Sequence, residues 1–396
     1  MSDWATDFDV LAPEYLSDPF AIWDYLRGRC PVAHTNRRGS TWLPTTYADV
    51  TAIAHDVERF SSLEVAVIPF ELEGPAPEAP VLPYGLPPIS ADPPLHTWTR
   101  RLILPWFSHK RVADYEVVTR ALCRSLIDGF VSSGSADAAA GYAQHIPARV
   151  IALVLGVQPE LEDTFIAWVR DVLEFADDQE RRRDGMRGLI HYFVSELERR
   201  RTDPGDDLLS AMVHTEMDGK PIEETVILGT AALVLIAGVD TTWSAIGSSL
   251  WHLATHDEDR RRLVAEPELM PLAIEELLRA YAPVTMARLV TGDVDYAGYP
   301  MKAGDKVLMN FPAANRDPQV FEDPGEVRLA RAVNRHVAFG SGIHRCAGSN
   351  LARMELTVAI EEWLAQIPEF HLAPAAEVTW CGGQVRGPRA LPVVFP

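Results

Sequence analysis

Residues 339–348 read FGSGIHRCAG, and the helical pattern SNLARMEL follows them at once. The glycines of this stretch let backbone amides approach the sulfur of Cys346, and the N-terminus of the following helix adds positive potential there. Both features favour a thiolate over a thiol. The stretch therefore predicts a cysteine that serves as a metal ligand, whereas the simpler interpretation is an inert, buried cysteine beside a glycine turn.

The rest of the chain is dominated by helical periodicity. Residues 222–256 can form one nearly uncharged helix of over 30 residues, which belongs in the middle of a protein. Amphipathic repeats over 269–283 and 349–367 predict two further helices. Strand patterns are short and late: in 293–311, GYPMKAG reads as a turn between two extended runs. We expect a mainly α fold with a minor β part.

Composition limits the cellular setting of the chain. With 396 residues, 47% of them hydrophobic, and no linker between two cores, residues 1–396 are predicted to form a single domain. The formal charge of −20 argues against a nucleic-acid partner and against anionic membranes. The uncharged run 225–239 is shorter than the roughly 20 residues of a membrane-spanning helix, and no basic segment leads into an early apolar run. We expect a cytoplasmic protein.

A polar pair interrupts the long apolar helix at AGVDTT, residues 237–242. Burying Asp240 and Thr241 there is costly without a partner or a purpose. The hydroxyl of Thr241 can bond to the carbonyl of Ala237, and Gly238 is expected to leave room for a flat group against the helix. The alternative is a satisfied polar pair at a packing kink.

Residues 339–348 resemble the haem-binding signature of the cytochrome P450 family, and AGVDTT resembles that family's oxygen-activation motif. The resemblance implies that Cys346 is the proximal ligand of haem b iron, that Phe339 packs beside the sulfur, and that His344 reaches a haem propionate. It also implies that Thr241 supports protonation of dioxygen and that Asp240 links it to solvent protons. The other cysteines, Cys30, Cys123 and Cys381, match no role in the family.

Two further motifs match the same family. In DPPLHTWTR, residues 92–100, Asp92 reads as a helix N-cap and Pro93 as the first helical residue, with His96 and Arg100 one turn apart on one face. The resemblance implies that His96, Arg100 and a later Arg288 bind haem propionates. It also makes Glu276, Arg279 and Arg331 a structural set rather than the surface ion pair that E-x-x-R commonly forms.

The resemblance, which covers nearly the whole chain, implies a triangular single-domain helical fold. It also implies insertion of one atom of O2 into an unactivated C–H bond, or oxidative O-dealkylation, with the other atom leaving as water.

No flavin, nicotinamide or iron–sulfur module is recognisable in the sequence, so a separate ferredoxin or flavodoxin with its reductase is expected to supply electrons. Basic residues expected to steer it are Arg100, Arg101, Lys110, Arg111, Arg345 and Arg353, unless they are merely scattered solvated charges. The alternatives are a peroxide-driven peroxygenase and a haem-based binding or sensing protein, and AGVDTT argues against both.

Family geometry also suggests a substrate pocket. Its predicted lining is apolar and consists of Leu233, Ile236, Val284, Met286 and Val385, which favours a small hydrophobic molecule. The proline-rich run 69–94 is the expected lid, with Ile68, Phe70 and Tyr84 as candidate contacts. Each of these residues is also compatible with plain core packing.

Overall fold

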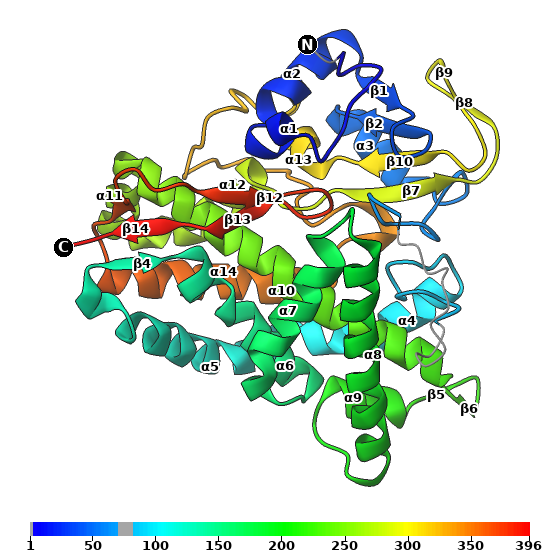
Figure 1. Cartoon of the computed structure of the whole chain (residues 1–396), viewed down its shortest axis with the longest axis horizontal. Helices are drawn as coiled ribbons and strands as arrows, with labels where there is room; N and C mark the ends of the chain where they lie inside the picture. The colour runs from blue at the N-terminus through cyan, green and yellow to red at the C-terminus, as the bar shows by residue number, and fades with distance from the viewer. Residues whose placement is uncertain (1–2, 70–81) are drawn as a thin grey trace. The chain divides into compact units, whose positions relative to one another are not determined.

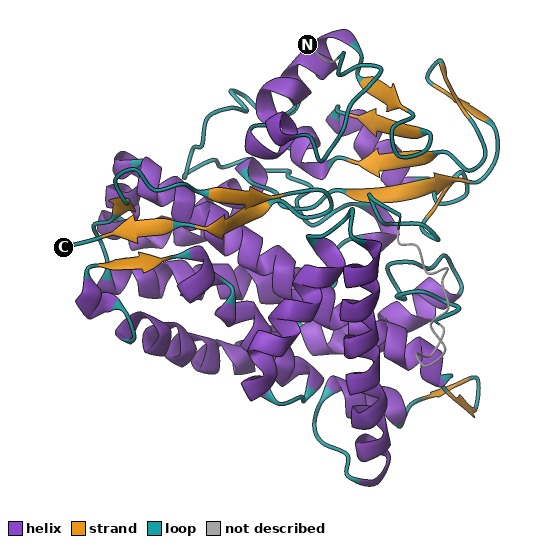
Figure 2. Ribbon diagram, in the orientation of Figure 1, coloured by secondary structure: helices purple, strands orange, loops and turns teal. Residues whose placement is uncertain are grey.

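The computed structural model describes residues 3–69 and 82–396, and helix is its main element. Helices account for 53% of the structure and strands for 12%, which Figure 2 shows in purple and orange. The mainly α fold with a minor β part is thus confirmed. The chain groups into two units: residues 1–69, 247–346 and 368–396 form the first, and residues 70–246 and 347–367 form the second.

The second unit is built from helices. Its helices are α4 (Leu95–Ile103), α5 (His109–Asp128), α6 (His145–Leu155), α7 (Glu162–Leu173), α8 (Gln179–Thr202), α9 (Leu208–Val213), α10 (Glu224–Thr255) up to Ile246, and α14 (Ser349–Gln366). Three short strands accompany them: β4 (Ser135–Asp137), β5 (Glu216–Met217) and β6 (Lys220–Pro221).

Helices α5 and α14 lie side by side in this unit (Figure 1). Arg124 Nε lies 2.7 Å from Glu362 Oε2, and Arg120 Nη1 lies 2.8 Å from Glu362 Oε1. Tyr142 donates its hydroxyl to the carbonyl of Ala359 at 2.7 Å. These contacts fix the helix that directly follows the cysteine loop in the chain.

Helix α10 is the predicted long helix, and its 32 residues confirm that expectation. It is the one helix of the described chain with the length and composition to cross a membrane, but 78% of its apolar window is buried inside the protein. A buried window is what the core helix of a globular fold presents. Its apolar sequence is therefore explained by packing.

The first unit holds a five-stranded sheet with strand order β1-β2-β10-β7-β3. Its strands are β1 (Val32–Thr35), β2 (Thr41–Pro44), β3 (Phe60–Ser61), β7 (Met286–Val290) and β10 (Lys306–Met309). The pairing of β10 with β2 is parallel, and the other neighbours pair antiparallel. The remaining strands are β8 (Val294–Tyr296), β9 (Tyr299–Met301), β11 (His371–Leu372), β12 (Thr379–Cys381), β13 (Gly387–Ala390) and β14 (Pro392–Val394).

Six helices belong to the first unit besides the end of α10. They are α1 (Pro13–Ser17), α2 (Phe20–Arg29), α3 (Tyr47–His55), α11 (Asp257–Ala265), α12 (Met270–Ala280) and α13 (Phe311–Ala314). The amphipathic repeats predicted over 269–283 and 349–367 appear as α12 and α14, so both expectations are confirmed.

The predicted turn GYPMKAG is wrong in its position. Tyr299–Met301, inside that stretch, is strand β9, and it pairs with β8 through the two-residue turn Ala297-Gly298. Both turn residues have positive φ, +51° and +88°, as a tight hairpin of this kind requires. The prediction failed because alanine is an uncommon residue in that conformation and gives no turn signal.

Candidate active site

The cysteine loop closes on itself through backbone hydrogen bonds. The amide of Cys346 donates to the carbonyl of Phe339 at 2.7 Å, and that of Gly340 donates to Val337 at 2.9 Å. Gly342 has φ +71°, and a Cβ there would collide with the carbonyl oxygen of Ala54. Glycine is therefore required at this position both by conformation and by the close approach of α3.

Side chains from distant parts of the first unit hold the loop in place. Ser62 Oγ lies 2.9 Å from His344 Nε2, and His55 Nε2 lies 2.8 Å from Ser341 Oγ. The amide of Val337 donates to Asn315 Oδ1 at 2.7 Å. His344 itself ends a short 3-10 turn, Gly342–His344. The conformation of the loop is thus fixed by contacts of the residues that precede the cysteine.

Cys346 differs from the other cysteines in its surroundings. It is exposed, whereas Cys123 is fully buried and burial raises the pKa of its thiol to about 12. A buried thiol of that kind stays protonated, and a protonated thiol is a poor metal ligand. The glycine loop, the exposed sulfur and the start of α14 at Ser349 fit the thiolate ligand of a haem iron. Haem b is the cofactor that this family binds.

The Glu276 carboxylate lies at the centre of a buried network that reaches the chain before the cysteine loop. Arg279 Nη2 lies 2.8 Å from Oε1, with both side chains fully buried, and Arg331 Nε lies 2.9 Å from Oε2. The amide of Arg328 and the side chain of Asn334 also donate to this carboxylate, at 2.8 and 3.1 Å. Burial alone would raise the pKa of Glu276, but the hydrogen bonds and charge of Arg279, with the other donors, hold it below the ordinary value.

The three carbonyls around Arg279 complete this network. Its guanidinium donates to the backbone oxygens of Asn315, Pro324 and Glu326 at 2.8–3.0 Å. A buried arginine is tolerated when every donor is satisfied in this way. Glu276, Arg279 and Arg331 therefore form the expected set and tie α12 to residues 315–334.

Arg288 and three predicted pocket residues also lie in the first unit. Arg288 is buried in β7, opposite Val307 of β10, and its Nη1 donates to the carbonyl of Ala287 at 2.7 Å. Val284 and Val385 form an antiparallel bridge, and Gln384 Nε2 lies 3.4 Å from Met286 Sδ. The structure thus brings Val284, Met286 and Val385 together.

The second unit carries His96 and Arg100 on α4, where they lie one turn apart as expected. His96 is buried and Arg100 is partly exposed. The predicted helix start is wrong: α4 begins at Leu95 with Pro94 as its N-cap residue. The carbonyl of Asp92 accepts the amide of His96 at 3.1 Å. Pro93 and Pro94 have no amide for a side-chain cap to satisfy, so a cap by Asp92 would gain little.

In α10, Thr241 makes the hydrogen bond that the sequence predicts. Its Oγ1 donates to the carbonyl of Ala237 at 2.7 Å, and Asp240 is buried. The prediction for Gly238 is wrong, because a Cβ there would lie 2.7 Å from Ile151 Cγ1 of α6. The space beside Gly238 is filled by a neighbouring helix. Ala237 is instead the exposed small residue, followed one turn later by the partly exposed Thr241.

Leu233 and Ile236 lie on the same helix and are both buried, with 9% and 6% of their surface exposed. The chain before α4 packs close by: a Cβ on Gly229, one turn before Leu233, would collide with the carbonyl of Gly85. Of the three predicted lid contacts, Ile68 is buried, Tyr84 is exposed and contacts Glu223, and Phe70 lies outside the described residues.

Comparison with known proteins agrees with this site. The family model for cytochrome P450 matches residues 162–374. A steroid C26-monooxygenase of Mycolicibacterium smegmatis is 34% identical, over 98% of this chain and 96% of its own length. A vitamin D(3) 25-hydroxylase of Pseudonocardia autotrophica is also 34% identical, over 92% of this chain and 90% of its own length.

Solved structures give the same answer. The crystal structure of CYP101J2 matches with a TM-score of 0.88 and 30% identity, covering 100% of this chain and 98% of that one. CYP109E1 from Bacillus megaterium, solved with testosterone, matches with a TM-score of 0.86 and 29% identity over 96% and 98%. The chain belongs to the cytochrome P450 family. It is an oxidoreductase of the monooxygenase class, which incorporates oxygen from O2.

Sequence reasoning missed several residues that the structure brings to the site. Ser62 at His344, and Asn334 with the amide of Arg328 at Glu276, gave no local signal because their partners are 52 to 282 residues away. Ala237 could be identified from the sequence as the small residue beside Thr241, because it lies one turn earlier on the same helical face.

Proposed function

We propose that this chain hydroxylates a small hydrophobic molecule, or removes an alkyl group from its oxygen, using electrons from a separate ferredoxin or flavodoxin with its reductase. One oxygen atom of O2 enters the substrate and the other leaves as water, which consumes two electrons and two protons. Haem b supplies the binding and activation of O2 when it is bound. Cys346 is proposed as its iron ligand beside Phe339, and His96, Arg100, Arg288 and His344 as its propionate contacts.

In this proposal the chain's own task is to position the substrate and to supply protons. Thr241 Oγ1 donates to Ala237 and keeps its own lone pairs for a further donor, so it can hold a proton-carrying water. Asp240, the preceding buried carboxylate, is proposed as the group that connects Thr241 with solvent protons.

The proposed substrate class is supported by the apolar character of the predicted pocket residues. Val284 and Val385 form a backbone bridge in the first unit, where Met286 contacts Gln384, and Leu233 and Ile236 share one stretch of α10 in the second. Such residues offer shape and dispersion but few hydrogen bonds, and this favours a compact apolar molecule over a polar one.

A second candidate is a larger apolar substrate of the steroid type. It is favoured by the names of similar proteins, among them a steroid C26-monooxygenase, a vitamin D(3) 25-hydroxylase and a structure solved with testosterone. The same apolar residues suit both candidates, so a binding series must separate them.

The deciding experiment compares two ways of driving the reaction. Product yield is measured with NADPH, ferredoxin and reductase, and separately with hydrogen peroxide alone. We expect efficient turnover only with the electron-transfer partners. Equal or better yield with peroxide would favour a peroxygenase, and no turnover with any substrate or oxidant would favour a binding or sensing role.

Two further parts of the proposal concern the chain as a whole. We infer a cytoplasmic location, supported by the burial of α10. We also infer that residues 1–396 unfold as one domain, because α10 runs without a break through residues of both units. A single calorimetric transition is the expected result, and two separate transitions would contradict it.

A further inference from the structure

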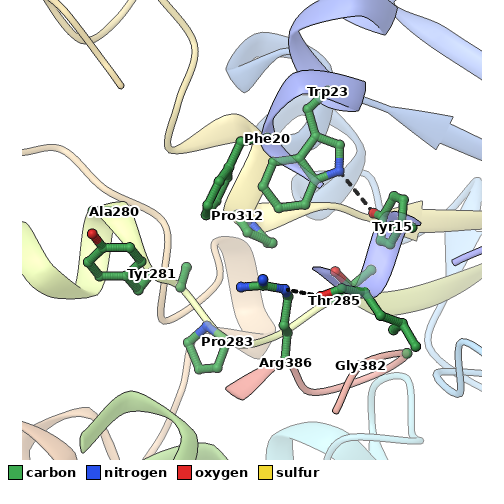
Figure 3. Close-up of a pocket in the computed structure, with 13 residues that line it drawn as sticks. Tyr15, Phe20, Trp23, Ala280, Tyr281, Pro283, Thr285, Pro312, Gly382 and Arg386 are labelled. Carbon is green, nitrogen blue, oxygen red and sulfur yellow. Dashed lines mark hydrogen bonds between the residues drawn. The ribbon is translucent and has the colours of Figure 1, made fainter. Parts of the chain in front are cut away.

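A small cavity in the first unit has an unusual lining, and none of its lining residues belongs to the cysteine loop. It measures about 20 Å³ and is lined by the rings of Tyr15, Phe20, Trp23 and Tyr281, by Pro283 and Pro312, and by two polar side chains, Thr285 and Arg386. Figure 3 shows the Arg386 guanidinium among these rings, while Trp23 donates to the hydroxyl of Tyr15 at 2.9 Å. The cavity thus presents one cation in apolar, aromatic surroundings.

Arg386 has only neutral partners. Its Nε and Nη2 donate to the carbonyls of Leu16 and Ser17 at 3.2 and 3.0 Å, and its guanidinium lies 4.3 Å from the ring centroid of Trp380. Among residues 3–69 and 82–396, no carboxylate comes within 4.0 Å of it, and Nη1 makes no hydrogen bond. Arg386 is partly exposed to solvent, and no carboxylate of the described chain pairs with its charge.

A second cation lies close to the same aromatic ring. The Arg316 guanidinium is 4.0 Å from the centroid of Phe20, and that of Arg386 is 5.6 Å from the same centroid. Arg316 also has no carboxylate within 4.0 Å in the described chain. Burial lowers the pKa of Arg386 to about 10. Cys381 and Asp18 oppose this shift, and the charge of Arg316 adds a smaller effect in the same direction as burial.

We propose that this cavity binds a single halide ion, chloride in solution, held by Arg386 Nη1 and the hydroxyl of Thr285. A cavity of about 20 Å³ accommodates one particle of about the size of a water molecule, which suits a monatomic anion and excludes sulfate or phosphate. Water also fits by size but brings no charge to balance two guanidinium groups. Weakly hydrated anions lose the least hydration free energy when they enter an aromatic cavity, so bromide should replace chloride.

The site joins four segments of the first unit that are far apart in the sequence. Its lining comes from α1 and α2 near the N-terminus, from the end of α12 and its connection to β7, from Pro312 of α13, and from the chain between β12 and β13. A bound anion therefore links residues 15–23 with residues 382–386. Halide binding is expected to stabilise the folded holoenzyme, because only the folded chain assembles the site.

The test uses crystals and thermal unfolding of the haem-loaded enzyme. Crystals soaked in sodium bromide should show an anomalous peak beside Arg386. At equal ionic strength, chloride or bromide should raise Tm by roughly 1–3 °C over gluconate. Arg386→Gln should abolish both effects, while Arg29→Gln should preserve them, because Arg29 is an exposed arginine of α2 whose bonds within the described residues go to Tyr25.

A second variant keeps the proposal testable if Arg386→Gln does not fold. Thr285→Val retains the shape of the side chain and the charge of Arg386 but removes one donor, so it should lower the bromide occupancy. The proposal is overturned if wild-type crystals show no anomalous peak in the cavity. It is also overturned if gluconate and halide give equal Tm values.

Discussion

Arg331 donates from Nε to Oε2 of Glu276 at 2.9 Å, although 55 residues separate the two in the sequence. The same carboxylate is shared with Arg279, and neither Glu276 nor Arg279 is exposed to solvent. The loop that carries Cys346 begins eight residues after Arg331. The conformation of the cysteine loop therefore depends on a charge network that lies outside it.

Glu276→Gln should destabilise the protein, because it leaves two arginines in a buried network with a neutral partner. Breaking a buried ion pair costs about 3–5 kcal/mol. We expect a loss of this order in the free energy of unfolding by urea, together with weaker haem retention. Glu275→Gln is the matched control: Glu275 contacts His336 at 2.9 Å and is more exposed, so its loss should cost far less.

The pH dependence gives this prediction a second readout. The pKa of Glu276 is lowered by folding, so its contribution is present above the pKa of the unfolded state, about 4.5, and is lost as the pH falls through the lower folded value. The difference in stability between wild type and E276Q should therefore shrink in acid. A difference that stays constant down to pH 3 would argue that packing, and not charge, is lost.

Cys346→Ser should remove the red-shifted Soret band that the reduced carbon monoxide complex of a thiolate-bound haem shows. Serine keeps the size of the side chain and the loop hydrogen bond from the residue 346 amide to Phe339, so the effect isolates the sulfur. Cys381→Ser is the control, because that thiol belongs to strand β12, where it donates to the carbonyl of Val385 at 3.4 Å. Persistence of the band in the Cys346 variant would remove this residue as the ligand.

The sequence predicted those parts of the molecule that depend on local patterns. The length of α10 followed from its uncharged run, because a buried helix needs apolar residues on all sides. The role of Gly238 was misjudged, since only the packed structure shows that Ile151 occupies its face. The start of α4 was misplaced because Pro93 and Pro94 have no amide for a side-chain cap to satisfy, and the β8–β9 turn because Ala297 adopts a positive φ that alanine does not signal. The bonds of Asn334 and of the Arg328 amide to Glu276, and the contact of Ser62 with His344, arise from tertiary contacts that no spacing encodes.

Thr241→Ala should leave haem and substrate binding intact but divert electrons into peroxide, because a proton donor is lost while O2 still binds. We expect product formed per NADPH consumed to fall severalfold. Thr230→Ala is a matched control on the same helix, since Thr230 makes the same bond to a carbonyl four residues earlier, 2.8 Å to Val226. Equal coupling in both variants would show that Thr241 is only a packing residue.

Lys110 should matter more than Arg111 for reduction by an acidic ferredoxin. Arg111 is paired with Asp206 at 2.5 Å and lies over the Trp106 ring, whereas the exposed Lys110 forms no ion pair within the described chain. Charge reversal at Lys110 should therefore slow reduction and flatten its dependence on salt. Asp206→Asn should accelerate reduction by releasing the charge of Arg111. Rates that are insensitive to ionic strength and to both substitutions would mean that these charges do not steer the partner.

The substrate class follows from the character of the residues proposed to contact it. Leu233, Ile236, Val284, Met286 and Val385 carry no charge, and Gln384 is already engaged with Met286. A ligand that brings a carboxylate or many hydroxyls would lose its hydration without gaining partners. In a series of Soret-shift titrations under fixed conditions, aromatic ethers, alkylbenzenes and monoterpenoids should therefore bind more tightly than fatty acids and macrolides.

Steroids form the separate arm that tests the larger apolar candidate: tighter binding of steroids than of monoterpenoids would assign the larger substrate class. Tightest binding by fatty acids or macrolides would refute the apolar pocket while leaving the monooxygenase class unchanged.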